Sequence, residues 1–211
     1  MTLKNILSEI EKELKEREEV KDELYDEMRK ATRLSKQAIF LVHKGQLKQA
    51  KKILKETKKL FTILEASAVH QKFAYTGIVD FAFQEYAEAN IFLKLVEDNR
   101  FIGPKKISAP STSYLLGLAD VIGELRRRAL DSLRKGNVGA AEKSLEKMEL
   151  IYDELMVIDE ALRVVSELRR KSDIARRIIE ATRGDVTIEV RRSSLEHSIK
   201  KLEKVLKTEK K

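Results

Sequence analysis

The 211-residue chain contains no cysteine and no tryptophan, and only two prolines and eight glycines interrupt it. Without cysteine, disulfide bonds, thiolate metal sites and cysteine nucleophiles are excluded. With so few helix breakers, long uninterrupted helices can form. No stretch approaches the roughly 20 consecutive apolar residues of a membrane-spanning helix. We therefore expect a cytoplasmic protein that has no membrane partner.

Charged residues make up 37% of the chain and aromatic residues 6%. A chain rich in Lys, Glu, Leu and Ala is typical of all-α proteins. The formal net charge of +8 favours an anionic partner, nucleic acid before membrane. Only 4 arginines precede residue 112 whereas 12 follow it, and arginine binds phosphate in a bidentate geometry that lysine lacks. Lysine-rich surfaces also occur without such a partner, so charge alone leaves the function open.

Apolar residues recur at spacings of three and four along nearly the whole chain, with no sustained period-two run. This pattern predicts an all-α fold of seven helices in a single domain spanning residues 1–211. Residues 1–20 are expected to be a charged helical extension, residues 208–211 a frayed tail, and the RGD motif at 183–185 a turn that ends the sixth helix. The expected helices cover about residues 3–44, 47–70, 78–97, 111–135 or 113–135, 140–157, 160–182 and 186–207.

The third expected helix carries two acidic residues among apolar neighbours. Its sequence, IVDFAFQEYAEANIFLKLV, is apolar almost all round, which predicts a buried helix. Glu85 and Glu88 stand at i, i+3 and lie about 60° apart around the helix axis. The turns above and below them are aromatic or aliphatic, unlike a solvated polar stripe.

The fourth expected helix contains a second acid pair in the sequence YLLGLADVIGELRRR at 114–128. Asp120 and Glu124 stand at i, i+4, about 40° apart, and Gly117 and Gly123 lie about 60° to either side of Asp120. Each glycine costs a helix about 1 kcal/mol relative to alanine. We infer that the two glycines keep the flanks of the carboxylates clear for an ion, a phosphate or another backbone.

These two acid pairs predict a metal site if the two helices are antiparallel neighbours. Four converging carboxylates cannot all stay ionised without a cation. Ligation by oxygen alone suits Mg²⁺, or Mn²⁺ as a second choice. No histidine follows a glutamate by three residues, which argues against a di-iron bundle. The alternative is that the acids form structural ion pairs, for which Lys94 and Arg126–Arg128 are candidates.

Several motifs resemble the translin family, and specifically its translin-associated factor X branch. The resemblance covers essentially the whole chain from about residue 20. It implies seven-helix subunits that assemble into a hollow homo-oligomeric shell, roughly an octamer, which binds single-stranded RNA or DNA. The motifs that carry it are YLLGLADVIGELRR at 114–127, FQEYAEA at 83–89, RLSKQAIFLVHKG at 33–45 and GNVGAAEKSLEKMELIYDELMVID at 136–159.

The factor X branch is a metal-dependent endoribonuclease, and the resemblance implies which residues act here. Carried over by position, the catalytic and metal-binding carboxylates are Glu85, Glu88, Asp120 and Glu124. This chain lacks the large inserts of eukaryotic members, which leaves open whether one polypeptide forms both shell and catalyst.

Three functions remain open from the sequence. The first is a Mg²⁺-dependent endoribonuclease acting on single-stranded RNA, in which Arg127 contacts a phosphate or instead pairs with Glu124. The second is a non-catalytic single-stranded nucleic-acid binder whose acids form structural pairs. The third is a helical scaffold that only oligomerises. The expected phosphate contacts on the first helix are Arg29, Lys30, Arg33 and Lys36.

Overall fold

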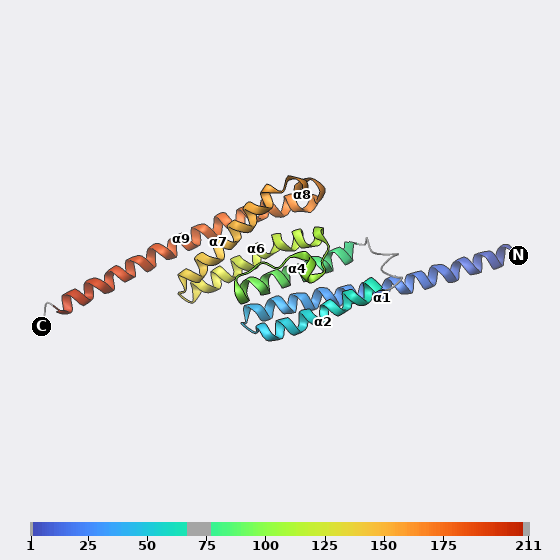
Figure 1. The fold of residues 1–211 in the computed structure, drawn as a ribbon, viewed down its shortest axis with the longest axis horizontal. Coiled ribbons are helices and arrows are strands. Elements are labelled where there is room, and N and C mark those ends of the chain that lie inside the picture. The colour runs from blue at the N-terminus through green and yellow to red at the C-terminus, as the bar shows by residue number, and fades with distance from the viewer. Residues whose placement is uncertain (1, 67–76, 209–211) are drawn as a thin grey trace. The chain divides into compact units, whose positions relative to one another are not determined.

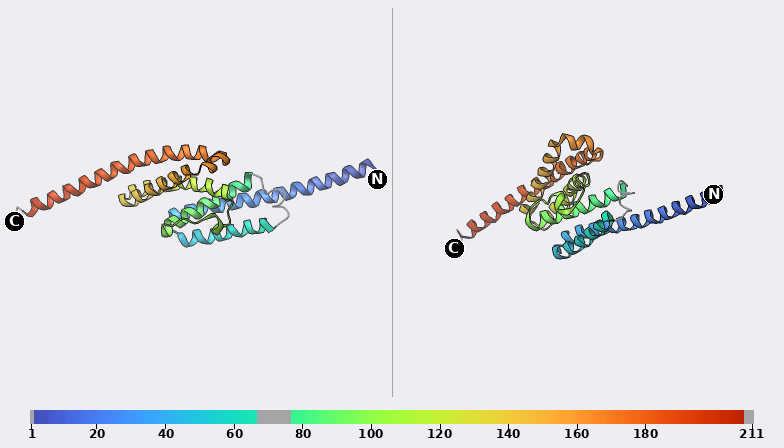
Figure 2. Two further views of the ribbon diagram at one scale, coloured as in Figure 1. Left: turned by 45° about the horizontal axis from the view of Figure 1, so that its top comes forward. Right: turned by 45° about the vertical axis from the view of Figure 1, so that its right-hand side comes forward.

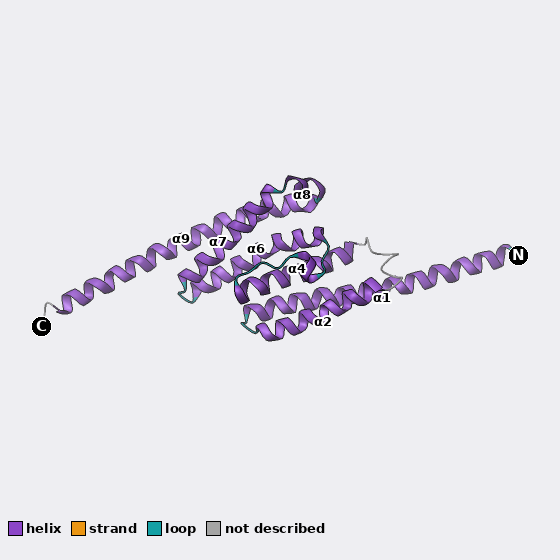
Figure 3. Ribbon diagram, viewed as in Figure 1, coloured by secondary structure: helices purple, strands orange, loops and turns teal. Residues whose placement is uncertain are grey.

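The computed structural model describes residues 2–66 and 77–208, which form helices joined by short connections, with no strand in these ranges (Figures 1 and 3). This confirms the predicted all-α class. None of the helices described is long and apolar enough to cross a membrane. Eight helices lie in the described ranges: α1 (Leu3–His43), α2 (Leu47–Ala66), α4 (Gly77–Asp98), α5 (Pro104–Ile107), α6 (Ser111–Arg134), α7 (Val138–Val157), α8 (Asp159–Val164) and α9 (Ser166–Thr208).

The chain divides into two compact units within α6, Met1–Gly117 and Leu118–Lys211. The first unit contains α1, α2, α4, α5 and the first turns of α6. The second contains the rest of α6 together with α7, α8 and α9. The organisation into one domain stays a prediction, and each unit is described by itself.

Helix α4 forms the core of the first unit. It is apolar on nearly every side, so it is stable only where other helices cover it. The α1–α2 hairpin packs against it (Figure 2). Phe92 of α4 is completely buried, and its ring centroid lies 4.8 Å from that of His43 on α1. Phe61 of α2 stacks on Phe83 of α4 at 4.0 Å. These contacts confirm the predicted burial of this helix.

The second unit is organised around α7 and α9, which pack along each other (Figure 1). The short helix α8 connects them. Met148, Ile151 and Leu155 of α7 face the interior, and Leu168 of α9 is fully buried. The spacing of three and four residues places the three α7 side chains on one face of that helix.

The predicted turn at residues 183–185 is wrong. Helix α9 runs without interruption from Ser166 to Thr208. Gly184 has open space where a Cβ would stand. It therefore destabilises the helix only by the lower helix propensity of glycine, about 1 kcal/mol relative to alanine. Its neighbours form ion pairs with other helices: Arg183 donates to Glu149 at 2.7 Å, and Asp185 lies 3.6 Å from Arg126. These pairs favour the helical register that the glycine alone would weaken.

Two further boundaries differ from the prediction. The expected helix 160–182 is split at Val165, whose side chain is buried while that of Val164 is exposed. The segment between the third and fourth expected helices contains the single-turn helix α5, which starts with Pro104 at its first position and buries Ile107. The predicted second helix ends, within the described residues, at Ala66, and residues 67–70 lie outside them.

The two glycines of α6 have different surroundings. A Cβ on Gly117 would stand 2.6 Å from the backbone oxygen of Gln84 and 2.9 Å from the backbone nitrogen of Glu88. Gly117 therefore lets the start of α6 approach the α4 backbone closely. A Cβ on Gly123 would meet nothing within 4 Å. Of the three reasons proposed for the glycines, close approach of another backbone holds for Gly117.

This difference gives a prediction for stability. We expect Gly117→Ala to lower the free energy of unfolding by about 1 to 3 kcal/mol, because the added methyl group would press on two backbone atoms. The matched control Gly123→Ala should raise it by about 0.5 to 1 kcal/mol, because alanine is the better helix former. Urea denaturation followed by circular dichroism measures both, and equal effects would contradict the assigned role of Gly117.

Candidate functional site

Two of the predicted acids are buried in the first unit. Glu85 and Glu88 of α4 are each only 8% exposed. Burying a carboxylate is costly unless a cation or hydrogen bonds compensate. Lys36 of α1 provides one such cation, because its Nζ lies 3.1 Å from Oε1 of Glu85. The same ammonium lies 5.6 Å from the ring centroid of Phe81, so a cation–π contact helps to hold it.

Tyr86 lies between these acids in the sequence and has a packing role. Burial raises the pKa of its phenol to about 12, and a contact with Asn90 offsets only part of this rise. The phenol is therefore neutral at physiological pH. Its ring packs at 5.2 Å from that of Phe61. Tyr86 thus belongs to the core and adds no charge to the acids beside it.

The other two acids are half-buried in the second unit. Nζ of Lys171, on α9, donates a hydrogen bond to Oδ1 of Asp120 at 2.5 Å. The side chain of Lys171 is 15% exposed and that of Asp120 28%. A small pocket of about 130 Å³ opens beside this pair, lined by Gly123 and Arg170 among others. Gly123 therefore borders a cationic pocket and not another backbone.

Glu124 pairs with a neighbour on its own helix. Arg127 places Nη1 3.9 Å from Oε2 of Glu124, and the arginine side chain is 53% exposed. A pair at i, i+3 with this long distance and a half-exposed arginine contributes little to stability. Arg126 instead donates to the Thr182 hydroxyl at 2.7 Å and holds α6 against α9. The proposed pairing of the acids with Lys94 is not observed, because Lys94 lies 2.6 Å from Asp98.

The phosphate contacts predicted on α1 are exposed, but most of them are engaged by acids. Arg33 differs from the others, because no ion pair of its guanidinium occurs within residues 2–66 and 77–208. An arginine without such a pair keeps its charge available for a phosphate. The three engaged side chains form the pairs Arg29–Asp26 at 3.5 Å, Lys30–Glu27 at 3.8 Å and Lys36–Glu85 at 3.1 Å.

Lys171 is a site residue that the sequence reasoning missed. It lies 51 residues after Asp120, on a different helix, and no spacing rule connects the two. Its only signal in the sequence is membership of the basic run RRK at 169–171. Lys36 was expected to contact nucleic acid, and the structure places it on a buried carboxylate.

The fit of a metal ion can be tested on the donor set. Across the described part of the chain, no group of three or more acidic or histidine side chains is arranged to hold a metal ion. The predicted ligands are all carboxylates, which suit Mg²⁺ or Mn²⁺ chemically. Lys36, Lys171 and Arg127 hold three of them in ion pairs, so a divalent cation would have to replace these side-chain cations. The metal site stays a prediction.

The sequence motifs and the helical fold agree with one family. Residues 19–207 match the Translin family. The chain belongs to the translin family. It is 32% identical over 192 residues to an uncharacterized protein of Methanocaldococcus jannaschii, a match that spans 90% of this chain and 85% of that protein.

Solved structures also resemble this translin-family chain. A structure described as a complex of AfC3PO with duplex RNA is 31% identical, with a TM-score of 0.73 over 87% of this chain and 95% of that one. A crystal structure of apo-NeC3PO is 27% identical, with a TM-score of 0.78 over 90% of this chain and 99% of that one. The shared fold therefore extends over nearly all of each chain.

The two pairs on α6 should differ in strength. A double-mutant cycle of Asp120→Asn with Lys171→Met is expected to give a coupling energy of about 1 to 2 kcal/mol, because both side chains are largely removed from water. The matched cycle of Glu124→Gln with Arg127→Met should give less than about 0.5 kcal/mol, because its distance of 3.9 Å is long and its arginine is half-exposed. Urea denaturation supplies the energies, and a stronger coupling in the second pair would contradict this ranking.

Proposed function

We propose that the chain binds RNA as a homo-oligomer and is a metal-dependent endoribonuclease of the translin-associated factor X type. The RNA-binding part of the proposal rests on membership of the translin family. The likeness to a structure described as a complex with duplex RNA supports it. The proposed substrate is single-stranded RNA, single-stranded DNA is a second ligand, and the proposed assembly is an octamer.

The burial of acids on α4 supports the catalytic part. Glu85 and Glu88 are buried on a helix that apolar residues would stabilise better. Two carboxylates at these positions make the fold less stable, and a function for them explains why they are present. In the proposal these two residues and the α6 acids Asp120 and Glu124 serve one reaction as ligands of Mg²⁺ or Mn²⁺.

The roles of the chain's own residues follow from their contacts. Bound Mg²⁺ would supply a Lewis acid that polarises the phosphate and activates water. The four carboxylates Glu85, Glu88, Asp120 and Glu124 would hold the cation. Lys171 pairs with Asp120 in the metal-free chain, and a divalent cation would have to displace its ammonium group. Arg127 is half-exposed next to Glu124, and its guanidinium can contact a phosphate oxygen of the RNA.

Substitution of single acids tests the catalytic proposal. We expect Glu88→Gln and Asp120→Asn each to reduce the cleavage rate of a labelled single-stranded RNA in Mg²⁺ by about a hundredfold or more, because each removes a charged ligand. The matched controls Asp80→Asn on α4 and Asp131→Asn on α6 should cleave at the wild-type rate. RNA binding in EDTA, measured by fluorescence anisotropy, should be retained by all four variants.

A second candidate function is a non-catalytic RNA binder. The ion pairs Lys36–Glu85 and Lys171–Asp120 favour it, because they explain two of the acids without a metal. RNA that is bound tightly but not cleaved at any concentration of Mg²⁺ or Mn²⁺ would select this candidate. Cleavage at equal rates by wild type and both ligand variants would overturn the assigned roles of the acids.

Arg33 provides a test of the α1 phosphate contacts. We expect Arg33→Gln to make the slope of log K against log salt about 0.7 shallower, the value for one phosphate contact on a single strand. Arg29→Gln is the matched control one turn earlier, and it should change the slope less, because Asp26 already pairs with Arg29. Anisotropy titrations between low and moderate salt measure both slopes. An unchanged slope for Arg33→Gln would show that this face of α1 does not contact the RNA.

A further inference from the structure

The first half of α1 has an apolar face that nothing in its unit covers. Residues 2–19 are exposed throughout and extend beyond α2 (Figure 1). Four aliphatic side chains, defined here as the N-terminal stripe, follow one another at spacings of four, three and four. They are Leu3, Leu7, Ile10 and Leu14, which are 71%, 56%, 46% and 58% exposed.

The N-terminal stripe continues a packing face that is buried further along the same helix. Leu24 and Met28 occupy the same alternating three-and-four pattern, and they are 2% and 0% exposed. This pattern is the one by which helices pack along each other. The exposed half of α1 therefore has the surface of a packed helix without a packing partner in its own unit.

The last part of α9 has a similar uncovered face. Helix α9 buries Leu168, Ala175 and Ile179 on the side that it turns to its own unit. A second set of aliphatic side chains, the C-terminal stripe, lies within an arc of about 60° on the opposite side. Its members are Ile188, Leu195, Ile199, Leu202 and Leu206, which are 66%, 62%, 47%, 63% and 58% exposed.

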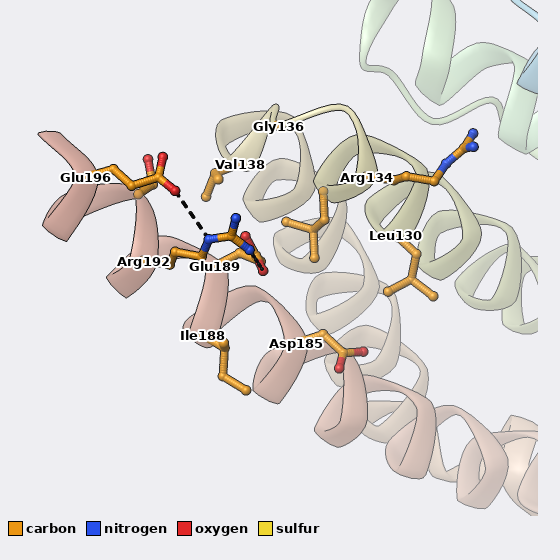
Figure 4. A pocket seen from close by; sticks show the side chains of 11 residues that line it. Leu130, Arg134, Gly136, Val138, Asp185, Ile188, Glu189, Arg192 and Glu196 are labelled. Atoms are coloured by element: carbon orange, nitrogen blue, oxygen red, sulfur yellow. Dashed lines mark hydrogen bonds and ion pairs between the residues drawn. The ribbon is translucent and has the colours of Figure 1, made fainter.

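The C-terminal stripe begins at a groove. A hollow of about 610 Å³ lies between α9 and the α6–α7 turn, with Leu130 and Val138 on one side and Ile188 on the other (Figure 4). Arg192 spans the α9 side, where it pairs with Glu189 at 3.5 Å and Glu196 at 3.3 Å. The stripe thus offers both a helix face and a recess at its start.

The charges of the two segments are complementary. Residues 2–19 contain six acidic and four basic side chains, and residues 188–208 contain three acidic and six basic ones. Glu11, Glu13 and Glu18 stand next to the N-terminal stripe, about 50° to 90° from its centre. Pairing of two copies of the same segment would bring like charges together, whereas pairing of the first segment with the second brings opposite charges together.

We propose that the N-terminal stripe of one copy packs along the C-terminal stripe of a second copy of this chain. The N-terminal stripe spans about 17 Å and the C-terminal stripe about 27 Å, so the longer one accommodates the shorter. The proposal rests on the homo-oligomer proposed above and assigns its contact surface. Residues 2–18, which carry the N-terminal stripe, lie outside the range that matches the translin family, whereas the C-terminal stripe lies inside it.

Disulfide cross-linking between separately prepared chains tests the pairing, because the natural chain has no cysteine. Glu11→Cys is mixed in turn with Arg191→Cys, Ser198→Cys and Glu203→Cys, three positions on the flanks of the C-terminal stripe. At least one mixture is expected to form a disulfide-linked dimer under mild oxidation. The control is Lys12→Cys with His197→Cys, which point away from both stripes, and it should form none.

The mass of the assembly supplies a second readout. Ile10→Asp with Leu14→Asp, and separately Leu195→Asp with Leu202→Asp, are expected to reduce the mass in sedimentation velocity to half or less of the wild-type value. Lys12→Asp on the far side of α1 should leave it unchanged. Circular dichroism shows whether each variant retains its helix content, and all altered side chains are exposed in the single chain.

The outcomes separate this proposal from the proposed function. A monomeric wild-type chain would overturn both the oligomer and the pairing. If the wild type is an oligomer and neither pair of stripe substitutions changes its mass, the pairing alone is overturned. Cross-links only between two α9 cysteines, or cross-links in none of the three mixtures, would also overturn it. RNA cleavage by the full-length stripe variants would leave the proposed activity standing in every case.

Discussion

The first unit depends on the burial of α4. A helix that is apolar on every side cannot face water, so α1, α2 and the start of α6 must cover it. Gly117 shows how closely the start of α6 packs on α4, because even one added methyl group would collide with the α4 backbone. Once α4 is enclosed in this way, whatever polar groups it carries are enclosed with it. The positions of Glu85 and Glu88 follow directly from this constraint.

The acids on α4 and α6 are compensated by different means. Glu85 is deeply buried, and a lysine whose own side chain is 59% exposed reaches it from the surface. Asp120 is more accessible, and it meets a lysine that is itself largely buried. In both cases a flexible ammonium group, and not a rigid arginine fork, holds the carboxylate. Lysine is a compact point charge on a flexible stem, so it can be displaced by a stronger cation more easily than a bidentate arginine. This is why structural ion pairs and a role in metal binding are compatible for these residues.

The two long helices combine a packed half with an exposed half. In α1 the same face serves the core and then continues into solvent, while in α9 the exposed apolar face lies opposite the buried one. A helical segment of this length has marginal stability on its own in water, so it gains from any surface that covers its apolar side. The opposite net charges of the two segments limit which surface that can be.

Much of the fold could be predicted from the sequence, because helix periodicity is a local property. The bounds of α1, α4, α6 and α7 agree with the predictions to within about two residues. The predictions failed where a tertiary contact outweighed a local signal. The RGD motif is typical of a turn, but here it is helical. The ion-pair partners of Arg183 and Asp185 lie on other helices. The break at Val165 carries no proline or glycine, and the side chain at the break is buried.

The sequence by itself determined the helical class, the two acid pairs and the family resemblance, because spacing along one helix sets which side chains share a face. Only the tertiary structure decided what those side chains touch. Gly117 and Gly123 look equivalent along α6, yet one meets a backbone and the other a pocket. Lys171 reaches Asp120 from 51 residues away, a distance over which helix periodicity carries no information. Partners of this kind arise from packing between helices, and packing depends on the whole unit rather than on any one segment.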